Sequence, residues 1–293
     1  MKHGVRRSFI YVLARVLAVL VFLLPMRIGV FLGGSLGVAL FYLLPKYRHQ
    51  AFENLSFAFN RPKSDVRIRA IARDVFKNLG LNAAEFINFP KINSRNIDKF
   101  IDIEGIEKID EALKNKKGCI ALSCHLGNWE LSAIYFGLKC YSPWVIARPL
   151  RDRRFDRLVN ALRRSKNINI IPRQQSFKKI VSILKENNLV GILPDQDIDS
   201  IDGVFVDFFG KKAYTPSGPV ILAMISGSPV FPAFCIRQNG RHKLIVEDEI
   251  KLELTGDRQK DIIANTQKWT SLAERYIRHY PEQWVWMHRR WKT

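Results

Sequence analysis

Two apolar segments open the chain, and a short break separates them. Residues 8–24 carry a single charge, at Arg15, and residues 28–44 carry none; the break, residues 25–27, reads Pro-Met-Arg. Each segment would form a helix of roughly 26 Å, just short of the roughly 30 Å hydrocarbon core of a bilayer. We therefore predict a membrane anchor over residues 1–45, as a hairpin or a shallow insertion. The alternative is a buried core helix.

Basic residues flank the anchor at both outer ends. They are Lys2, His3, Arg6 and Arg7 before it, and Lys46, Arg48 and His49 after it. Positive residues remain preferentially on the cytoplasmic side of a membrane, so we expect both ends there. A cleaved signal peptide would end in a small-x-small site, and this chain has Pro-Met-Arg instead.

Residues 33–37, Gly-Gly-Ser-Leu-Gly, match the G-x-S-x-G pattern of hydrolase nucleophiles. That motif needs a strand before the serine and a helix after it, whereas here it lies within one apolar helix. Gly29, Gly33 and Gly37 recur every four residues, which is the spacing that lets two helices approach closely. We therefore predict close helix packing at these glycines and no catalytic role for Ser35.

Beyond the anchor, apolar runs of strand length alternate with amphipathic runs of helix length. A long helix is predicted at residues 64–89. Strands are predicted at residues 119–123, 144–147, 168–171, 189–193, 230–236 and 243–246. Helices are predicted at residues 127–137, 155–165, 177–187, 215–225 and 262–279. This alternation indicates an α/β fold with a mostly parallel central sheet flanked by helices. No repeat or linker divides residues 46–293, which we take as one domain.

The charge balance narrows the possible partners. The chain has 47 Lys and Arg against 27 Asp and Glu, a net charge of +20. Such a chain attracts nucleic acid, an anionic membrane surface or an acidic protein. The sequence contains no nucleic-acid-binding motif, and a membrane anchor is hard to reconcile with nucleic-acid binding. We therefore expect no nucleic-acid partner. The four cysteines form no C-x-x-C pair and suit a reducing compartment, and the six scattered histidines predict no metal site.

One segment carries the features of a reaction centre. The predicted strand 119–123 leads into Cys124-His125-Leu126-Gly127-Asn128-Trp129-Glu130. In α/β sheets, ligands bind beyond the carboxyl ends of strands. If the chain turns at Gly127, Glu130 can hold one ring nitrogen of His125 and leave the other free as a base; the alternative is a histidine that only satisfies a loop. Cys124 points away from His125 in an extended segment, so we expect no covalent intermediate on the enzyme and direct action of His125 on a substrate hydroxyl.

Residues 125–130 match the H-x₄-D/E signature of glycerolipid-type acyltransferases. Their sequence, His-Leu-Gly-Asn-Trp-Glu, closely resembles the late acyltransferases of lipid A biosynthesis, the lauroyl/myristoyl acyltransferase family. Four further blocks resemble that family in the same order, at residues 148–163, 194–210, 215–232 and 281–291. With the anchor, the resemblance covers nearly the whole chain.

The resemblance implies transfer of a fatty acyl chain, without a cofactor, from acyl carrier protein to a hydroxyl of a lipid A precursor at the inner membrane. His125 would be the general base, and Glu130 would orient it. Further positions implied in substrate binding or transition-state support are Asn128, Arg148, Arg163 and Asp195. An arginine there suits phosphate or the charge that develops at the thioester carbonyl. Taken alone, Arg163 beside Arg164 is typical of a solvated helix face.

The sequence leaves two candidates for the acyl donor and more than one for the acyl acceptor. Residues 148–157 contain five arginines, and such a basic surface would steer an acidic acyl carrier protein, with Arg151 and Arg154 expected to point outward. A coenzyme A thioester is also anionic, so charge alone does not separate the two donors. Another glycolipid, such as a phosphatidylinositol mannoside, or a lysophospholipid is the alternative acceptor. Trp284, Trp286 and Trp291 would form an interfacial belt or pack on the core.

Overall fold

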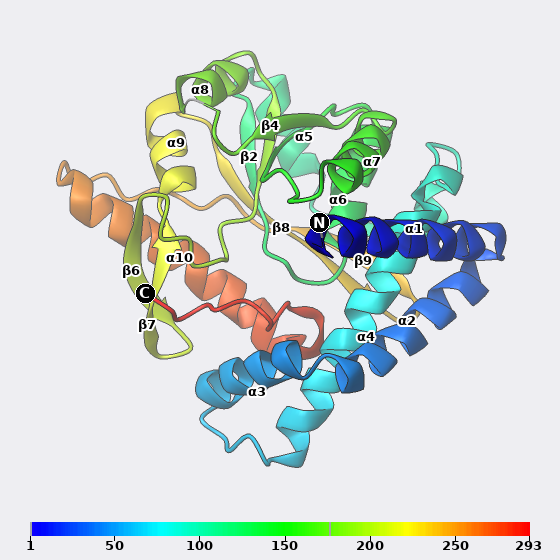
Figure 1. Ribbon diagram of the computed structural model, residues 1–293. Helices are drawn as coiled ribbons and strands as arrows, with labels where there is room; N and C mark the ends of the chain where they lie inside the picture. Colours follow the sequence, from blue (N-terminus) through cyan, green and yellow to red (C-terminus); the bar gives the residue numbers. More distant parts are fainter. Residues whose placement is uncertain (1, 176) are drawn as a thin grey trace.

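A seven-stranded sheet with helices on both faces forms the centre of the molecule (Figure 1). The computed structural model describes residues 2–175 and 177–293, and for residues 2–7 only the backbone. The predicted basic flank at Lys2, His3, Arg6 and Arg7 thus has its side chains outside the described residues. The strands of the sheet are β1 (Ile101–Glu104), β2 (Cys119–Leu122), β3 (Trp144–Ala147), β4 (Asn169–Pro172), β5 (Leu189–Ile192), β8 (Val230–Gln238) and β9 (Arg241–Val246).

Most neighbouring strands in this sheet run parallel. The spatial order is β1-β9-β8-β2-β5-β3-β4, and the strands from β8 to β4 all run in one direction. Only β9 turns back antiparallel from β8, and β1 then pairs with β9 in parallel. The predicted α/β class with a mostly parallel sheet is confirmed. The carboxyl ends of β2, β5 and β3 consequently lie side by side at one edge, where ligands bind in such folds.

Helices cover both faces of the sheet and enclose two apolar cores. Side chains alternate along β2, so Ile120 and Leu122 enter one core while Cys119 and Ala121 enter the other. The α-helices are α1 (Lys2–Leu23), α2 (Met26–Leu43), α3 (Pro45–Phe59), α4 (Val66–Asn88), α5 (Glu107–Lys114), α6 (Trp129–Leu138), α7 (Arg153–Arg164), α8 (Phe177–Lys185), α9 (Gly218–Ser226) and α10 (Arg258–His279). Three short 3₁₀ helices span Phe89–Lys91, Ile97–Lys99 and Pro281–Gln283.

An antiparallel hairpin lies outside the main sheet. Its strands are β6 (Gly203–Phe208) and β7 (Lys211–Pro216), and β6 packs beside α10. The helix predicted from residue 215 therefore begins later, at Gly218, because residues 215–216 still pair with β6.

Helix α2 meets helix α4 through glycines. Pro25 separates α1 from α2, as predicted. Gly33 of α2 packs against Gly80 of α4 so closely that a Cβ on Gly80 would lie 2.1 Å from the Gly33 carbonyl oxygen. Gly37 meets the backbone of Phe76 in the same way. The predicted close packing is confirmed, and Ser35 lies inside α2 with Oγ donating to the carbonyl of its own preceding turn.

The opposite sides of α1 and α2 are apolar and exposed. Phe9 and Leu23 of α1 and Phe31 and Leu43 of α2 are all about 70% exposed. Among the described helices, α2 alone is long and apolar enough to cross a membrane, while residues 8–23 of α1 form a shorter apolar stretch. Membrane attachment through these helices stays a prediction.

Candidate active site

Two residues at the carboxyl ends of adjacent strands form a close pair. His125 follows β2 and Asp195 follows β5, and these strands pair in parallel. Nδ1 of His125 lies 2.7 Å from Oδ1 of Asp195, and the backbone N–H of His125 donates to Oδ2 at 2.9 Å. Because an ionised carboxylate only accepts hydrogen bonds, Nδ1 carries a proton, and in the neutral ring Nε2 keeps its lone pair.

The C-terminal segment closes over this pair. The indole Nε1 of Trp284 donates to Oδ2 of Asp195 at 2.8 Å. The backbone N–H of Val285 donates to the carbonyl of His125 at 3.1 Å, and Leu126 forms a β-bridge with Trp284. Trp284 and Trp286 are fully buried, so they pack on the core and do not form an interfacial belt.

The surroundings of the pair shift both pKa values. Burial opposes a charged imidazole, but the charge and hydrogen bond of Asp195, with the charge of Glu130, outweigh it and raise the pKa of His125 above 6.5. Burial alone would raise the pKa of Asp195, yet the neighbouring His125 holds that pKa well below its usual range. The carboxylate therefore stays ionised and favours a proton on the imidazole beside it.

Glu130 has a different partner from the one expected. It lies in the first turn of α6 and accepts hydrogen bonds from Nε of Arg163 at 3.1 Å and from Nη2 of the same residue, at the end of α7. The turn at Gly127 starts a helix that presents Glu130 to α7, so the ring of His125 is free to pair with Asp195. The prediction that Glu130 orients His125 is therefore wrong for this structure: Asp195 holds the ring, and Glu130 acts on it only through its charge.

Asn128 serves the fold. Its Oδ1 accepts the backbone N–H of Leu131 at 3.0 Å and caps α6, while its Nδ2 donates to Glu85 at 2.6 Å. The side chain is buried with both ends engaged, which argues against the predicted contact with substrate.

Arg148 follows β3 at the same edge of the sheet as the His125–Asp195 pair. Its side chain is exposed and forms no hydrogen bond or ion pair with any described residue. A contact between Arg148 and an anionic group of the substrate stays a prediction.

Two residues near His125 were not singled out from the sequence. The amide nitrogen of Gln196 lies 3.5 Å from Nε2 of His125 and 3.4 Å from Nε2 of His288. Burial lowers the pKa of His288 to about 4, so its ring is neutral at pH 7 and carries one N–H. Gln196 directly follows Asp195, so its place near the site could be inferred from the sequence. No local pattern links His288 to His125.

Within the described part of the chain, His125, Asp195 and His288 are the one cluster of this kind whose side chains are placed to hold a metal ion. Their ligand atoms all lie within 4.8 Å of one another. Nδ1 of His125 and Oδ1 of Asp195 are hydrogen-bonded to each other. This arrangement is typical of a general base.

The family model for bacterial lipid A biosynthesis acyltransferases matches residues 3–293. The chain belongs to this family. It is 26% identical over 273 residues to the lipid A biosynthesis palmitoleoyltransferase of Escherichia coli K12, covering 92% of this chain and 87% of the relative. It is also 26% identical over 280 residues to the lipid A biosynthesis lauroyltransferase of that organism, covering 94% and 88%.

A second group of relatives is named for a different acceptor, phosphatidylinositol mannoside. The phosphatidylinositol mannoside acyltransferase of Mycolicibacterium smegmatis is 24% identical over 250 residues, covering 83% of this chain and 79% of the relative. As a member of the lipid A acyltransferase family, the chain is an acyl-transferring enzyme.

The basic surface of this acyltransferase differs in one respect from the expected one. Arg151, Arg153 and Arg157 are exposed around the start of α7. Arg154 does not point outward, because its guanidinium lies 4.4 Å from the ring centroid of Tyr11 and donates to Oγ of Ser8 at 3.2 Å. This arginine fastens α1 to α7, so it is not free to bind a donor.

Proposed function

We propose that this acyltransferase moves a fatty acyl chain from acyl carrier protein to a hydroxyl of a lipid A precursor in lipopolysaccharide biosynthesis. The observation that carries the proposal is the hydrogen bond between Nδ1 of His125 and the buried carboxylate of Asp195, which leaves Nε2 as the basic atom of the neutral ring. The side chain of His125 is 23% exposed and that of Asp195 4%. The base thus reaches solvent and substrate while its partner does not.

The reaction needs no covalent acyl-enzyme. The acceptor hydroxyl gives its proton to Nε2 of His125 as its oxygen attacks the thioester carbonyl carbon. The tetrahedral intermediate collapses by breaking the carbon–sulfur bond, and the leaving thiolate takes the proton back from His125. Cys124 is not the nucleophile, because complete burial raises the pKa of its thiol and keeps it protonated.

Neutral donors near His125 suit the oxyanion of that intermediate. The amide nitrogen of Gln196 lies 3.5 Å from Nε2 of His125, where the reacting carbonyl must come, and 3.4 Å from Nε2 of His288, whose ring centroid lies 5.5 Å from that of His125. Such fixed donors lower the barrier most when little water surrounds them. Arg148, exposed at the same edge, is suited to a phosphate of the acceptor, and Arg163 holds Glu130 beside the imidazolium that forms.

Donor and membrane would meet the protein on surfaces close to this edge. The exposed arginines Arg151, Arg153 and Arg157 would attract an acidic acyl carrier protein. The apolar sides of α1 and α2 would enter the inner membrane, with the catalytic domain on its cytoplasmic side. A phosphatidylinositol mannoside is the second candidate acceptor, supported by the similarity to the mycobacterial enzymes.

The test combines purified full-length protein with acyl carrier protein thioester and either acceptor in mixed micelles. Mass spectrometry should show one added acyl chain on the lipid A precursor, and none with His125→Ala. Lipid A from a deletion strain should lack the same chain. Acylation of the mannoside alone would assign the second acceptor, and full activity of His125→Ala would refute the mechanism.

A further inference from the structure

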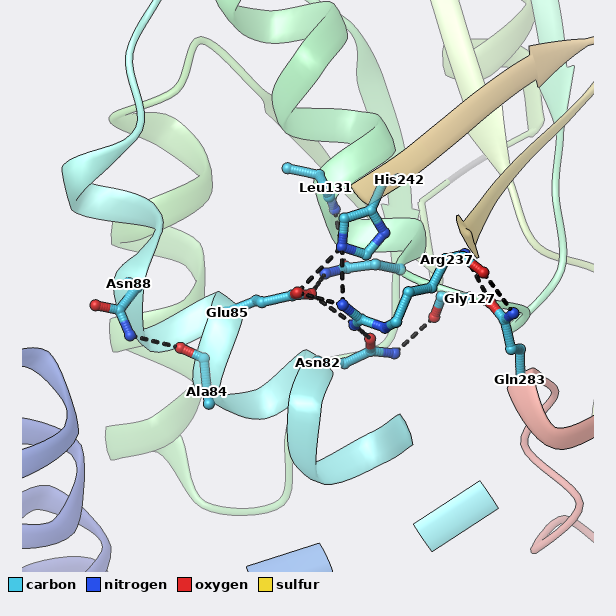
Figure 2. A network of polar contacts seen from close by, with 10 residues as sticks. Asn82, Ala84, Glu85, Asn88, Gly127, Leu131, Arg237, His242 and Gln283 are labelled. Carbon is cyan, nitrogen blue, oxygen red and sulfur yellow. Dashed lines mark hydrogen bonds and ion pairs between the residues drawn. The ribbon is translucent and has the colours of Figure 1, made fainter. Parts of the chain in front are cut away.

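A buried ionic cluster lies beside the loop that carries His125. Glu85 of α4 accepts hydrogen bonds from both Nη atoms of Arg237 at the end of β8, and its Oε1 lies 3.1 Å from Nε2 of His242 on β9 (Figure 2). The side chains of Glu85 and His242 are only 7% and 5% exposed. Removing such groups from water costs free energy, and apolar residues of similar volume often stabilise a fold at least as much as a buried ion pair does. The cluster therefore suggests a role in fixing geometry.

The cluster holds the loop after His125 at two points. Nδ2 of Asn128 donates to Oε2 of Glu85 at 2.6 Å. Arg237 donates to Oδ1 of Asn82 at 2.8 Å, and Nδ2 of Asn82 in turn donates to the carbonyl of Gly127 at 2.6 Å (Figure 2). Gly127 has a φ of +58°, and a Cβ there would lie 1.9 Å from a carbonyl oxygen of β8, so the loop is pressed directly onto that strand.

The same cluster holds the segment that fixes Asp195. The backbone N–H of Arg237 donates to Oε1 of Gln283 at 2.7 Å, and Nε2 of Gln283 returns a bond to the carbonyl of Arg237 at 2.9 Å. The carbonyl of Gln283 accepts the N–H of Gly127 at 3.0 Å. The next residue is Trp284, which donates to Asp195. Both members of the His125–Asp195 pair are thus connected to Arg237 through short chains of hydrogen bonds.

We propose that Asn82, Glu85 and Arg237 are positioning residues that keep His125 in register with Asp195 during acyl transfer. The proposal rests on the proposed function, since it gives these residues a purpose in that reaction. Burial alone would raise the pKa of Glu85, but His242 and Arg237 lower it to about 2. The carboxylate of Glu85 therefore stays ionised throughout the pH range in which His125 titrates.

Three single variants separate positioning from a direct effect of charge on His125. Asn82→Ala removes a hydrogen bond to the loop without changing charge, Glu85→Gln removes a negative charge, and Arg237→Gln removes a positive one. If the cluster positions the pair, each variant weakens the Asp195–His125 bond and lowers the pKa of His125. A direct electrostatic effect would lower that pKa in Glu85→Gln, raise it in Arg237→Gln and leave it unchanged in Asn82→Ala.

The full-length variants are compared by steady-state kinetics and by NMR titration of ring-labelled histidine, with His125→Ala assigning the signal. We expect kcat to fall about ten- to a hundredfold with little change in KM, since small displacements of reacting groups have effects of that size. The acidic limb of the pH–rate profile should move to lower pH in all three variants. A pKa of His125 that rises in Arg237→Gln would overturn the proposal.

The matched control is Asp261→Asn, at a buried carboxylate in the first turn of α10 that accepts hydrogen bonds from Thr255, which precedes the helix. It should lower the melting temperature and leave both kcat and the pKa of His125 unchanged. If the three variants behave as this control does, the cluster is merely structural and the proposal is wrong. Asn82→Ala is the mildest change. If the two charge variants fail to fold, kcat and the pKa of His125 in Asn82→Ala decide whether the cluster positions His125. If the wild type transfers no acyl chain, the proposed function fails, while the NMR titration still decides whether the cluster positions His125.

Discussion

Replacing Asp195 by asparagine is the sharpest test of the His125 mechanism, because that carboxylate accepts three hydrogen bonds. They come from Nδ1 and the backbone N–H of His125 and from Nε1 of Trp284, at 2.7, 2.9 and 2.8 Å. An amide of the same shape has one accepting oxygen. If its NH₂ faces the imidazole, Nδ1 must accept, the ring proton moves to Nε2, and the base is lost.

The expected loss is large and falls on kcat. A positioned general base contributes about 10²–10⁴ in rate, and the same substitution beside a catalytic histidine in a serine protease lowers kcat by about 10⁴. We expect Asp195→Asn to lower kcat by about 10²–10⁴ with little change in KM. Since His125 must be neutral to act, wild-type activity should fall as the pH drops through its pKa, which lies above 6.5. Without the Asp195 charge, that limb should move to lower pH.

The assay measures acylated acceptor by mass spectrometry across the neutral pH range, with wild type, Asp195→Asn and Glu130→Gln in parallel. Glu130 pairs with Arg163, so Glu130→Gln should lose less activity. The reasoning is refuted if Asp195→Asn transfers at the wild-type rate while Glu130→Gln is inactive. That result would show that Glu130 orients His125 in the working enzyme.

Three other outcomes test the fold, the donor surface and the chemistry. Gly80→Ala should lower the free energy of unfolding by about 1–3 kcal/mol, measured by urea titration, because its Cβ meets the carbonyl of Gly33; at an open helix position the same change would stabilise. Arg153→Glu with Arg157→Glu should raise the KM for acyl carrier protein donor severalfold, an effect that shrinks with added salt; an equal loss with a small thioester would place them at the acceptor. Removing divalent ions with EDTA should leave the rate unchanged, whereas a loss reversed by one metal would assign His288 and its neighbours to a metal site.

Local patterns were sufficient to predict most of the fold. Residues 119–123 form a continuous apolar run because both faces of β2 are covered, and that burial is visible in the sequence. The exit of the strand at His125 and the spacing of Gly33 and Gly37 are local features too. The end of β2 before His125 and the close packing at Gly33 and Gly37 could therefore be predicted from the sequence.

The pairing of side chains depended on the order of the strands, which no local pattern encodes. Asp195 reaches His125 because β5 lies next to β2, although the two residues are far apart in sequence. Arg154 was expected in solvent from its place in α7, but α1 packs there and supplies Tyr11. In both cases the contact is made by a helix or strand that lies far away in the sequence.

Helix α4 connects the N-terminal helices with the active site, since different sides of it serve different partners. Gly80 receives α2 at Gly33, and two to five residues later Asn82 and Glu85 hold the loop after His125. Both contacts lie within about two turns of one helix. The exposed apolar surface of α2 therefore cannot shift relative to the loop after His125 without disturbing one of these contacts. For an enzyme whose acceptor is held in a bilayer, as proposed here, this rigid connection would set the depth at which the acceptor hydroxyl meets its base.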